Sequence, residues 1–108
     1  KAKRELTECL KVALLGVDGV SLFVEPPDCQ SNYWLQTLIL NDSVADQRES
    51  ILMHANEVGL GFRPPWELLD RVGYLDNAPR MPSILISEVA RKLINIPSSP
   101  KLCLDNVK

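Results

Sequence analysis

The sequence has few of the residues from which most enzyme sites are built. Its single histidine, His54, has no second histidine and no paired carboxylates at metal-ligand spacing around it, so we expect it to be structural or solvated. No glycine-rich loop follows a predicted strand to hold a phosphate, and Ser98 and Ser99 lack a nucleophile elbow or a recognisable base. The chain is therefore not expected to contain a complete active site.

A strong charge of one sign and long apolar runs are also missing. Twelve basic and fourteen acidic residues give a formal net charge of -2, and the basic residues are spread along the chain. A nucleic-acid partner is therefore not expected. No apolar run is long enough to span a bilayer, and no leader of the secretory type is visible, so we expect a cytoplasmic protein with no membrane contact.

The three cysteines, Cys9, Cys29 and Cys103, are odd in number and far apart. They lack the Cys-x-x-Cys spacing of zinc and redox sites. We therefore expect three reduced thiols.

The length is that of one domain, 1–108, which is large enough to bury a single core. The sequence opens on Lys1 instead of methionine. An apolar stripe from Leu6 to Leu14 predicts a helix over residues 1–15 that begins without a capping residue. Both features predict a piece of a longer polypeptide.

The rest of the chain alternates between strand-like and helix-like patterns. A small, mainly antiparallel sheet covered by helices, an α+β fold, is the architecture that this order predicts. Because both faces of the second strand are largely apolar, we expect cover on both sides. The predicted elements are strands at Val20–Val24, Tyr33–Leu40, Leu60–Arg63 and Leu93–Pro97, helices at Ser43–Val58 and Ser83–Lys92, and a helical turn at Trp66–Arg71.

One arginine lies in an unusual setting, in the stretch GLGFRPPWELL of residues 59–69. The two prolines that follow Arg63 favour an extended, stiff backbone, and its guanidinium is a planar fork of donors suited to a carboxylate or a phosphate. Trp66 offers a stacking face nearby. The alternative is that Arg63 pairs with Glu67 or Asp70 while Trp66 fills the core, and the residues alone leave both open.

Three blocks of the sequence resemble one enzyme family in their order and spacing. SNYWLQTLIL, RESILMHANEVGLGFRPPWELL and EVARKLINIPSSP are similar to the C-terminal part of the DegT/DnrJ/StrS family of pyridoxal-phosphate-dependent sugar aminotransferases. The resemblance covers nearly the whole chain and is strongest to the LegC-like branch, which acts on nucleotide-linked 4-keto sugars. It implies the small C-terminal domain of a fold-type I aminotransferase, with residues 1–15 as the helix that links it to the large domain.

The resemblance also implies where the cofactor would be held. In such enzymes the lysine that forms the Schiff base with pyridoxal phosphate belongs to the large domain, and none of the six lysines here lies in a similar context. The parent enzyme is expected to be a homodimer. It would move an amino group from an amino acid, expected to be glutamate, to a nucleotide-linked ketosugar in the biosynthesis of bacterial surface aminosugars such as those of lipopolysaccharide.

By the same resemblance, the small domain supplies a wall of the substrate cleft. Many relatives carry a His-Tyr pair at this place. This chain reads FRPPW there, which is also the pattern of the LegC-like branch. Carried over residue by residue, Arg63 and Trp66 face the nucleotide sugar, and Asn32 and Tyr33 lie near the same cleft. Two alternatives are a stand-alone α+β binding module, and a dehydratase relative in which a histidine replaces the Schiff-base lysine.

Overall fold

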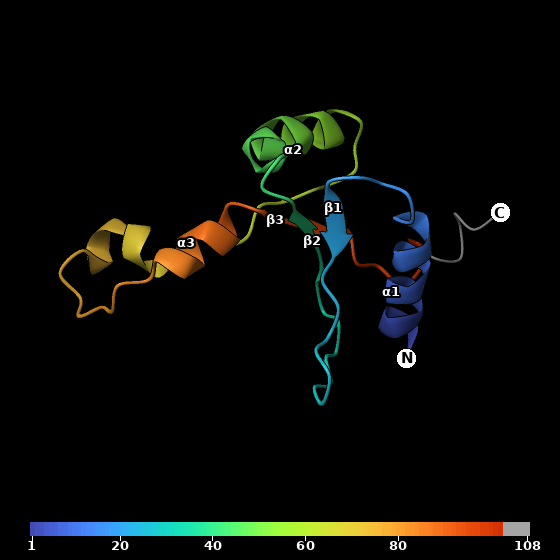
Figure 1. Ribbon diagram of the computed structural model, residues 1–108, viewed down its shortest axis with the longest axis horizontal. Helices are drawn as coiled ribbons and strands as arrows, with labels where there is room; N and C mark the ends of the chain where they lie inside the picture. Colours follow the sequence, from blue (N-terminus) through green and yellow to red (C-terminus); the bar gives the residue numbers. More distant parts are fainter. Residues whose placement is uncertain (103–108) are drawn as a thin grey trace.

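The structure is a computed structural model, and it describes residues 1–102 (Figure 1). Within these residues the chain forms three α-helices and one three-stranded antiparallel sheet, so the predicted α+β class is confirmed. The strands are β1 (Val20–Leu22), β2 (Gln36–Leu40) and β3 (Leu93–Ile96), with β2 in the middle. The last strand comes from the far end of the sequence, so the sheet joins both ends of the chain.

The core lies on one face of β2. Leu38 is paired with Leu22 on one side and with Ile94 on the other. Together with Leu40 and with Leu52 of the second helix, Leu38 and Ile94 form the buried cluster. The residues of β2 that alternate with these, Thr37 and Ile39, are half-buried, so the second face of the strand is partly covered.

Two helices pack on this buried face. Helix α1 (Ala2–Ala13) buries Leu6 and Thr7, and the Thr7 hydroxyl is 3.0 Å from the side-chain nitrogen of the buried Gln36, which donates to it. Helix α2 (Arg48–Glu57) follows a 3-10 turn at Ala45–Gln47 and contributes Leu52. Because that turn occupies the predicted first turn, the helix begins later than expected, and neither α2 nor the 3-10 turn has a side-chain cap.

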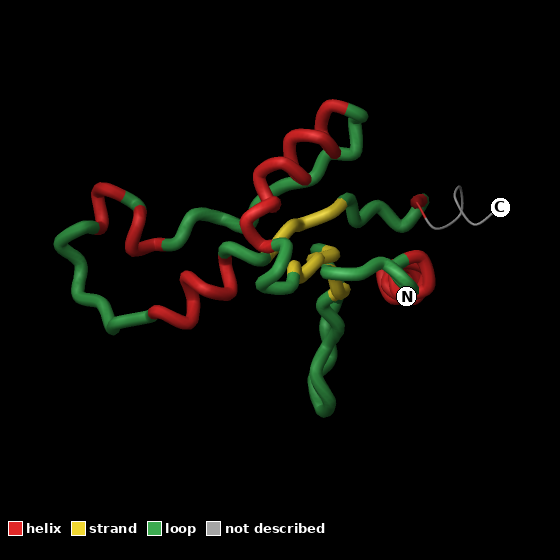
Figure 2. Tube along the Cα trace, turned by 45° about the horizontal axis from the view of Figure 1, so that its top comes forward, coloured by secondary structure: helices red, strands yellow, loops and turns green. Residues whose placement is uncertain are grey.

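The third helix, α3 (Ile84–Ala90), falls within the predicted range but has no buried residue. Further 3-10 turns lie at Leu69–Arg71 and Gly73–Leu75. Figures 1 and 2 show that residues 64–92, which we call the arm, stand out to one side of the sheet, with α1 on the other.

The predicted strand Leu60–Arg63 is absent and only one bridge, from Arg63 to Asn95, remains of it. Gly59 and Gly61 both have positive φ, at 85° and 66°, which an extended strand does not allow. The chain therefore turns twice before Arg63 and is stopped after it by Pro64, which has no N–H to donate.

Because of the arm, the chain has a larger radius of gyration than a compact domain of the same length. The Cα radius of gyration is 15.7 Å, whereas a compact domain of this length has about 13 Å. Large apolar side chains are exposed along the arm, which gives it a surface suited to contact with another protein surface. They are Trp66, Leu69, Tyr74, Met81, Ile84, Leu85, Ile86 and Val89.

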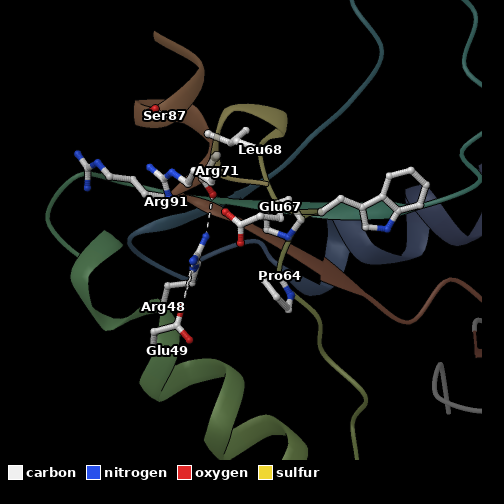
Figure 3. A pocket seen from close by; sticks show the side chains of 11 residues that line it. Arg48, Glu49, Pro64, Glu67, Leu68, Arg71, Ser87 and Arg91 are labelled. Atoms are coloured by element: carbon white, nitrogen blue, oxygen red, sulfur yellow. Dashed lines mark hydrogen bonds and ion pairs between the residues drawn. The ribbon is translucent and has the colours of Figure 1, made fainter. Parts of the chain in front are cut away.

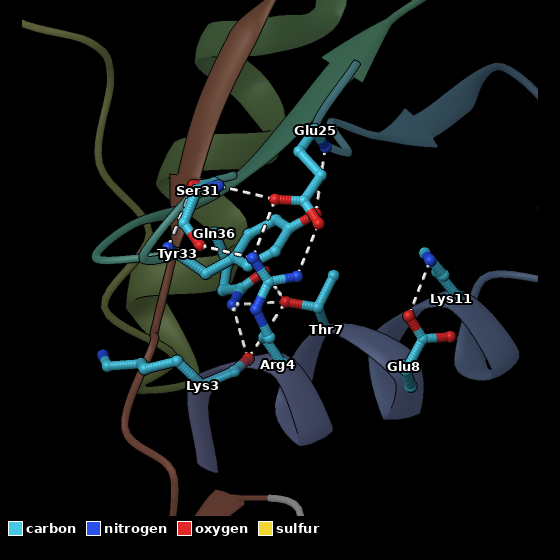
Figure 4. Close-up of polar contacts among 9 residues, drawn as sticks. All are labelled: Lys3, Arg4, Thr7, Glu8, Lys11, Glu25, Ser31, Tyr33 and Gln36. Atoms are coloured by element: carbon cyan, nitrogen blue, oxygen red, sulfur yellow. Dashed lines mark hydrogen bonds and ion pairs between the residues drawn. The ribbon is translucent and has the colours of Figure 1, made fainter. Parts of the chain in front are cut away.

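A polar network joins α1 to the loop between β1 and β2 (Figure 4). The Arg4 guanidinium makes two hydrogen bonds to the Glu25 carboxylate, at 2.5 and 2.8 Å, and stacks over the Tyr33 ring at 5.3 Å. The Ser31 amide donates to the same carboxylate. The Arg4 hydrogen bonds, followed by that of Ser31, lower the pKa of Glu25 from 4.5 to about 2.

This network predicts an acid-sensitive contribution to stability. Glu25 has a lower pKa when folded than when unfolded, so its contribution is present above about pH 4.5 and is lost as the pH falls toward 2. Glu25→Gln is expected to be less stable than wild type at neutral pH, and the difference should close in acid. Urea unfolding of both proteins across this pH range measures the difference in their free energies of unfolding. A difference that does not change with pH would contradict the prediction.

The cysteines differ from expectation at one position. Cys29 is a free, exposed thiol, whereas Cys9 is disulfide-bonded, so the prediction of a reduced thiol is wrong for Cys9. Sequence spacing detects local pairs only, whereas a disulfide joins residues that the fold brings together. Cys103 lies outside the described residues.

Candidate functional site

The backbone of Arg63 is tied to the edge of the sheet. Its N–H donates to the Asn95 carbonyl at 2.9 Å, and the Asn95 N–H donates back to the Arg63 carbonyl at 2.7 Å. Asn95 is itself in β3. Arg63 is therefore held by the sheet on one side and by the stiff Pro64–Pro65 pair on the other.

The side chain of Arg63 is available to a ligand. Residue Arg63 is exposed and makes no ion pair within residues 1–102. The alternative pairing with Glu67 or Asp70 is therefore wrong. A guanidinium with free donors on a fixed backbone is suited to bind an anion, because only the side chain and not the backbone has to be ordered on binding.

Trp66 is 83% exposed as a residue, so the alternative in which it fills the core is also wrong. Its indole meets that of Trp34 edge to face, with ring centroids 6.5 Å apart and planes at 73°. Trp34 is 61% exposed as well. The two indoles form an exposed aromatic pair, which we call the tryptophan pair, against which a planar or sugar ring can stack.

The tryptophan pair brings the predicted residues at 32 and 33 into the neighbourhood of Trp66. Asn32 is exposed, and its side-chain oxygen accepts a hydrogen bond from the Trp34 amide at 3.0 Å. Tyr33 is only 6% exposed, and its hydroxyl accepts from the Glu25 amide at 2.9 Å. Asn32 therefore orients the chain at Trp34, whereas Tyr33 belongs to the buried side of the polar network.

A pocket of about 300 Å³ opens beside this surface, between α2, the segment 64–71 and α3 (Figure 3). Its lining includes Pro64 and Trp66, which follow Arg63 in the sequence. Figure 3 shows Arg48 and Glu49 rising from α2 on one side, with Arg71, Arg91 and Ser87 across from them. We call it the arginine pocket after its three arginines.

The arginines of this pocket differ in their partners. Arg48 donates to the Ala90 carbonyl at 2.7 Å and pairs with Glu49 at 2.9 Å. Arg91 pairs with Glu88 at 2.9 Å and with Asp42 at 2.8 Å. Arg71 has no side-chain partner among the described residues. Two guanidiniums are thus positioned by the fold, and the third is free.

The charged groups around α3 also shift one another's pKa values. The pKa of the Asp42 carboxyl is lowered, chiefly by its hydrogen bond to Lys92 and also by Arg91. The pKa of Arg91 is raised, first by its hydrogen bond to Glu88. Both shifts favour the charged forms, so the ion pairs of Asp42 and Arg91 persist throughout the neutral range.

Residues 1–102 offer neither a metal site nor, in the arginine pocket, a lysine for pyridoxal phosphate. Histidine, cysteine and carboxylate side chains nowhere gather there in groups that suit a metal. A Schiff base needs a lysine beside a pocket, but Lys11 and Lys92 are engaged with acids and Lys3 with the Ser98 carbonyl. No lysine lines the arginine pocket. The lining of this pocket therefore supplies no lysine for a Schiff base.

The sequence interpretation missed Trp34 and the three arginines. Arg48, Arg71 and Arg91 are far apart in the sequence, and only the packing of the arm beside α2 brings them together. Trp34 adjoins the predicted Asn32 and Tyr33, and that adjacency was a usable signal.

A comparison with known protein families gives no match, and neither does a search of curated proteins. The class of protein that the fold and the site define is therefore an α+β domain with an exposed cationic and aromatic surface. Among the described residues, no helix has both the length and the apolar character needed to cross a bilayer.

Proposed function

We propose that the chain is the small C-terminal domain of a pyridoxal-phosphate-dependent aminotransferase of the DegT/DnrJ/StrS family, close to its LegC-like branch. The parent enzyme would transfer an amino group from an amino acid, glutamate in this proposal, to a nucleotide-linked ketosugar for bacterial surface aminosugars. Three sequence blocks in register support it, and so does the α+β fold.

The observation that carries the proposal is the state of Arg63. Its guanidinium is exposed and has no ion pair in the described part of the chain, although its backbone is fixed by two hydrogen bonds to Asn95. A free cation on a fixed backbone, three residues before an exposed indole, is suited to a ligand that combines negative charge with a ring. A nucleotide-linked sugar has both.

In this proposal the residues of the chain bind and orient the substrate, and they carry out no covalent step. Arg63 contacts the anionic part of the nucleotide sugar, and Trp66 with Trp34 offers a surface for a ring. Asn32 holds the turn on which Trp34 is presented. Pyridoxal phosphate, when bound elsewhere in the parent, supplies an electron sink for the transfer.

The proposed partners are the large domain of the same enzyme and a second copy of the parent. The exposed apolar side chains of the arm support such contacts, because a free-standing domain rarely leaves so many uncovered. A cytoplasmic location is also part of the proposal. The disulfide at Cys9 is at odds with it, because disulfides are uncommon in reducing compartments.

The 108-residue chain alone is expected to form no stable adduct with pyridoxal phosphate, because no lysine lines the arginine pocket and because the proposal assigns the Schiff-base lysine to the large domain. Incubation with the cofactor, borohydride reduction and intact-mass measurement test this. Surface lysines react to a low and variable extent. A single stoichiometric adduct on one lysine would contradict the prediction.

The experiment that tests the proposal is to read the gene upstream of the Lys1 codon and assay the full-length product. An open frame that continues into a large domain with a Schiff-base lysine, and amino transfer to a nucleotide-linked ketosugar, would support it. A histidine in place of that lysine would favour the dehydratase. A start codon next to Lys1 would leave a stand-alone binding module.

A further inference from the structure

Both indoles of the tryptophan pair are attached to the same part of the sheet, the end of β3. Trp66 comes shortly after Arg63, whose backbone is hydrogen-bonded in both directions to Asn95 of β3. Trp34 is bonded just beyond the strand, because the Ser98 hydroxyl donates to its carbonyl at 2.9 Å. The position of one ring relative to the other therefore depends on how the backbone of Trp34 is held against Ser98.

Lys3, on the first turn of α1, contacts both sides of this junction. Its ammonium donates to the Ser98 hydroxyl at 3.1 Å, to the Ser98 carbonyl, and to the Trp34 carbonyl at 3.4 Å. The hydroxyl thus accepts from Lys3 and donates to Trp34, and hydrogen bonds from a charged donor are roughly twice as strong as neutral ones. We propose that Lys3 is a positioning residue for the tryptophan pair, which holds Trp34 against the end of β3 so that its indole meets that of Trp66.

The backbone of Lys3 is itself firmly attached to the sheet. Its carbonyl accepts from the Thr7 hydroxyl at 3.0 Å and from the Gln36 side-chain amide at 3.4 Å (Figure 4). Thr7 and Gln36 are each only 1% exposed. Because a buried polar group that loses its partner is costly, the first turn of α1 is fixed relative to β2. Lys3 therefore reaches the junction from a rigid base.

The backbone next to Trp34 also needs support from outside. Tyr33 has a φ of 48°, in the left-handed region that residues other than glycine rarely adopt, and such a conformation persists only where its surroundings hold it. The Ser31 hydroxyl accepts from the Tyr33 amide at 3.0 Å, and the Ser31 carbonyl accepts from Arg4 at 2.8 Å. Arg4 thus holds the start of this turn, and Lys3 holds the end that carries the indole.

The test uses the optical activity of the indoles. The chain has two tryptophans and both are in the pair, so a circular-dichroism couplet produced by two interacting indoles reports on the pair alone. It is measured on the 108-residue chain well below its melting transition. Wild type is expected to show the couplet. Trp66→Phe should abolish it, because a couplet needs both rings, and this identifies the signal.

Lys3→Met keeps the apolar stem of the side chain and removes its donors. We expect the couplet to fall by roughly twofold or more, because an indole on a loosened backbone samples several orientations. Ser98→Ala removes the hydroxyl between Lys3 and Trp34, should act in the same direction, and keeps the test usable if Lys3→Met does not fold. Thermal unfolding confirms that each variant is folded.

The matched control is Lys11→Met, the same substitution on the same helix. Lys11 pairs with Glu8, so this variant should leave the couplet unchanged. A couplet of wild-type size in folded Lys3→Met and Ser98→Ala would overturn the proposal. An equal loss in Lys11→Met, or a wild-type spectrum that Trp66→Phe does not alter, would overturn it as well.

The effect on ligand binding rests on the proposed function. In the full-length enzyme, Lys3→Met should raise KM for the nucleotide sugar severalfold and leave kcat unchanged, because the tryptophan pair offers a surface for a ring and takes no part in the covalent step. The couplet needs neither a substrate nor a large domain. A reduced couplet in an enzyme without aminotransferase activity would therefore keep Lys3 as a positioning residue and remove the proposed function.

Discussion

Replacing Ile94 by alanine is expected to lower the free energy of unfolding of the chain by about 2–5 kcal/mol. Ile94 is fully buried, at 0% exposure, in the middle of β3, where it is paired with Leu38 and packs in the cluster with Leu40 and Leu52. The loss combines the apolar surface returned to water with the cavity that remains. Because a whole domain is stabilised by only about 5–15 kcal/mol, the effect is large.

Urea unfolding followed by circular dichroism measures this effect. Ile86→Ala is the matched control, since it is the same substitution on an exposed side chain of α3, and it should change stability by less than about 0.5 kcal/mol. Ile94→Val, expected to cost about 0.5–1.5 kcal/mol, keeps the test usable if the alanine variant does not fold. Equal losses for Ile94→Ala and Ile86→Ala would mean that the core does not lie where the structure has it.

The second large effect is expected in catalysis. Under the proposed function, Arg63→Ala in the full-length enzyme should lower kcat/KM for the nucleotide sugar by roughly ten- to a hundredfold. A hydrogen bond to a charged group contributes about 1.5–3 kcal/mol, and the loss of Arg63 leaves the anion without that partner. Steady-state kinetics against the sugar nucleotide measure the change.

Two features separate this prediction from a structural effect. Arg63 is tied to Asn95 through backbone groups, so the alanine variant keeps both hydrogen bonds and should keep its melting temperature. Arg63→Lys retains the charge without the planar fork, and an intermediate rate is expected. Lys11→Ala is the control for loss of surface charge. Unchanged kinetics together with a lowered melting temperature would make Arg63 a structural residue.

The local patterns predicted much of the fold for physical reasons that are easy to name. Helix α1 lies within the range that its apolar stripe predicted, with Leu6 of that stripe buried, and strand β2 lies within the predicted strand Tyr33–Leu40. The predicted strand before Arg63 failed because the apolar residues there are separated by glycines with positive φ. Apolar character alone does not distinguish an extended segment from a turn.

The sequence predicted the candidate site only where residues adjacent in the sequence determine the local backbone conformation. The prolines after Arg63 predicted a stiff, extended segment, because proline restricts the residue that precedes it. Tyr33 was expected beside a cleft, but its ring lies beneath Arg4, a contact between residues distant in sequence. The arginine pocket depends on packing between the arm and α2, which no local pattern encodes.

The bridge between Arg63 and Asn95 has a consequence for how the domain can vary. These two residues are hydrogen-bonded to each other, so the chain leaves the sheet at Arg63 and returns to the same point at Asn95. The arm is therefore part of a loop that is closed at its base. Each doubling in the length of such a loop costs only about 0.6 kcal/mol. The arm can therefore be lengthened, shortened or exchanged for that of another protein while the sheet and its core stay as they are.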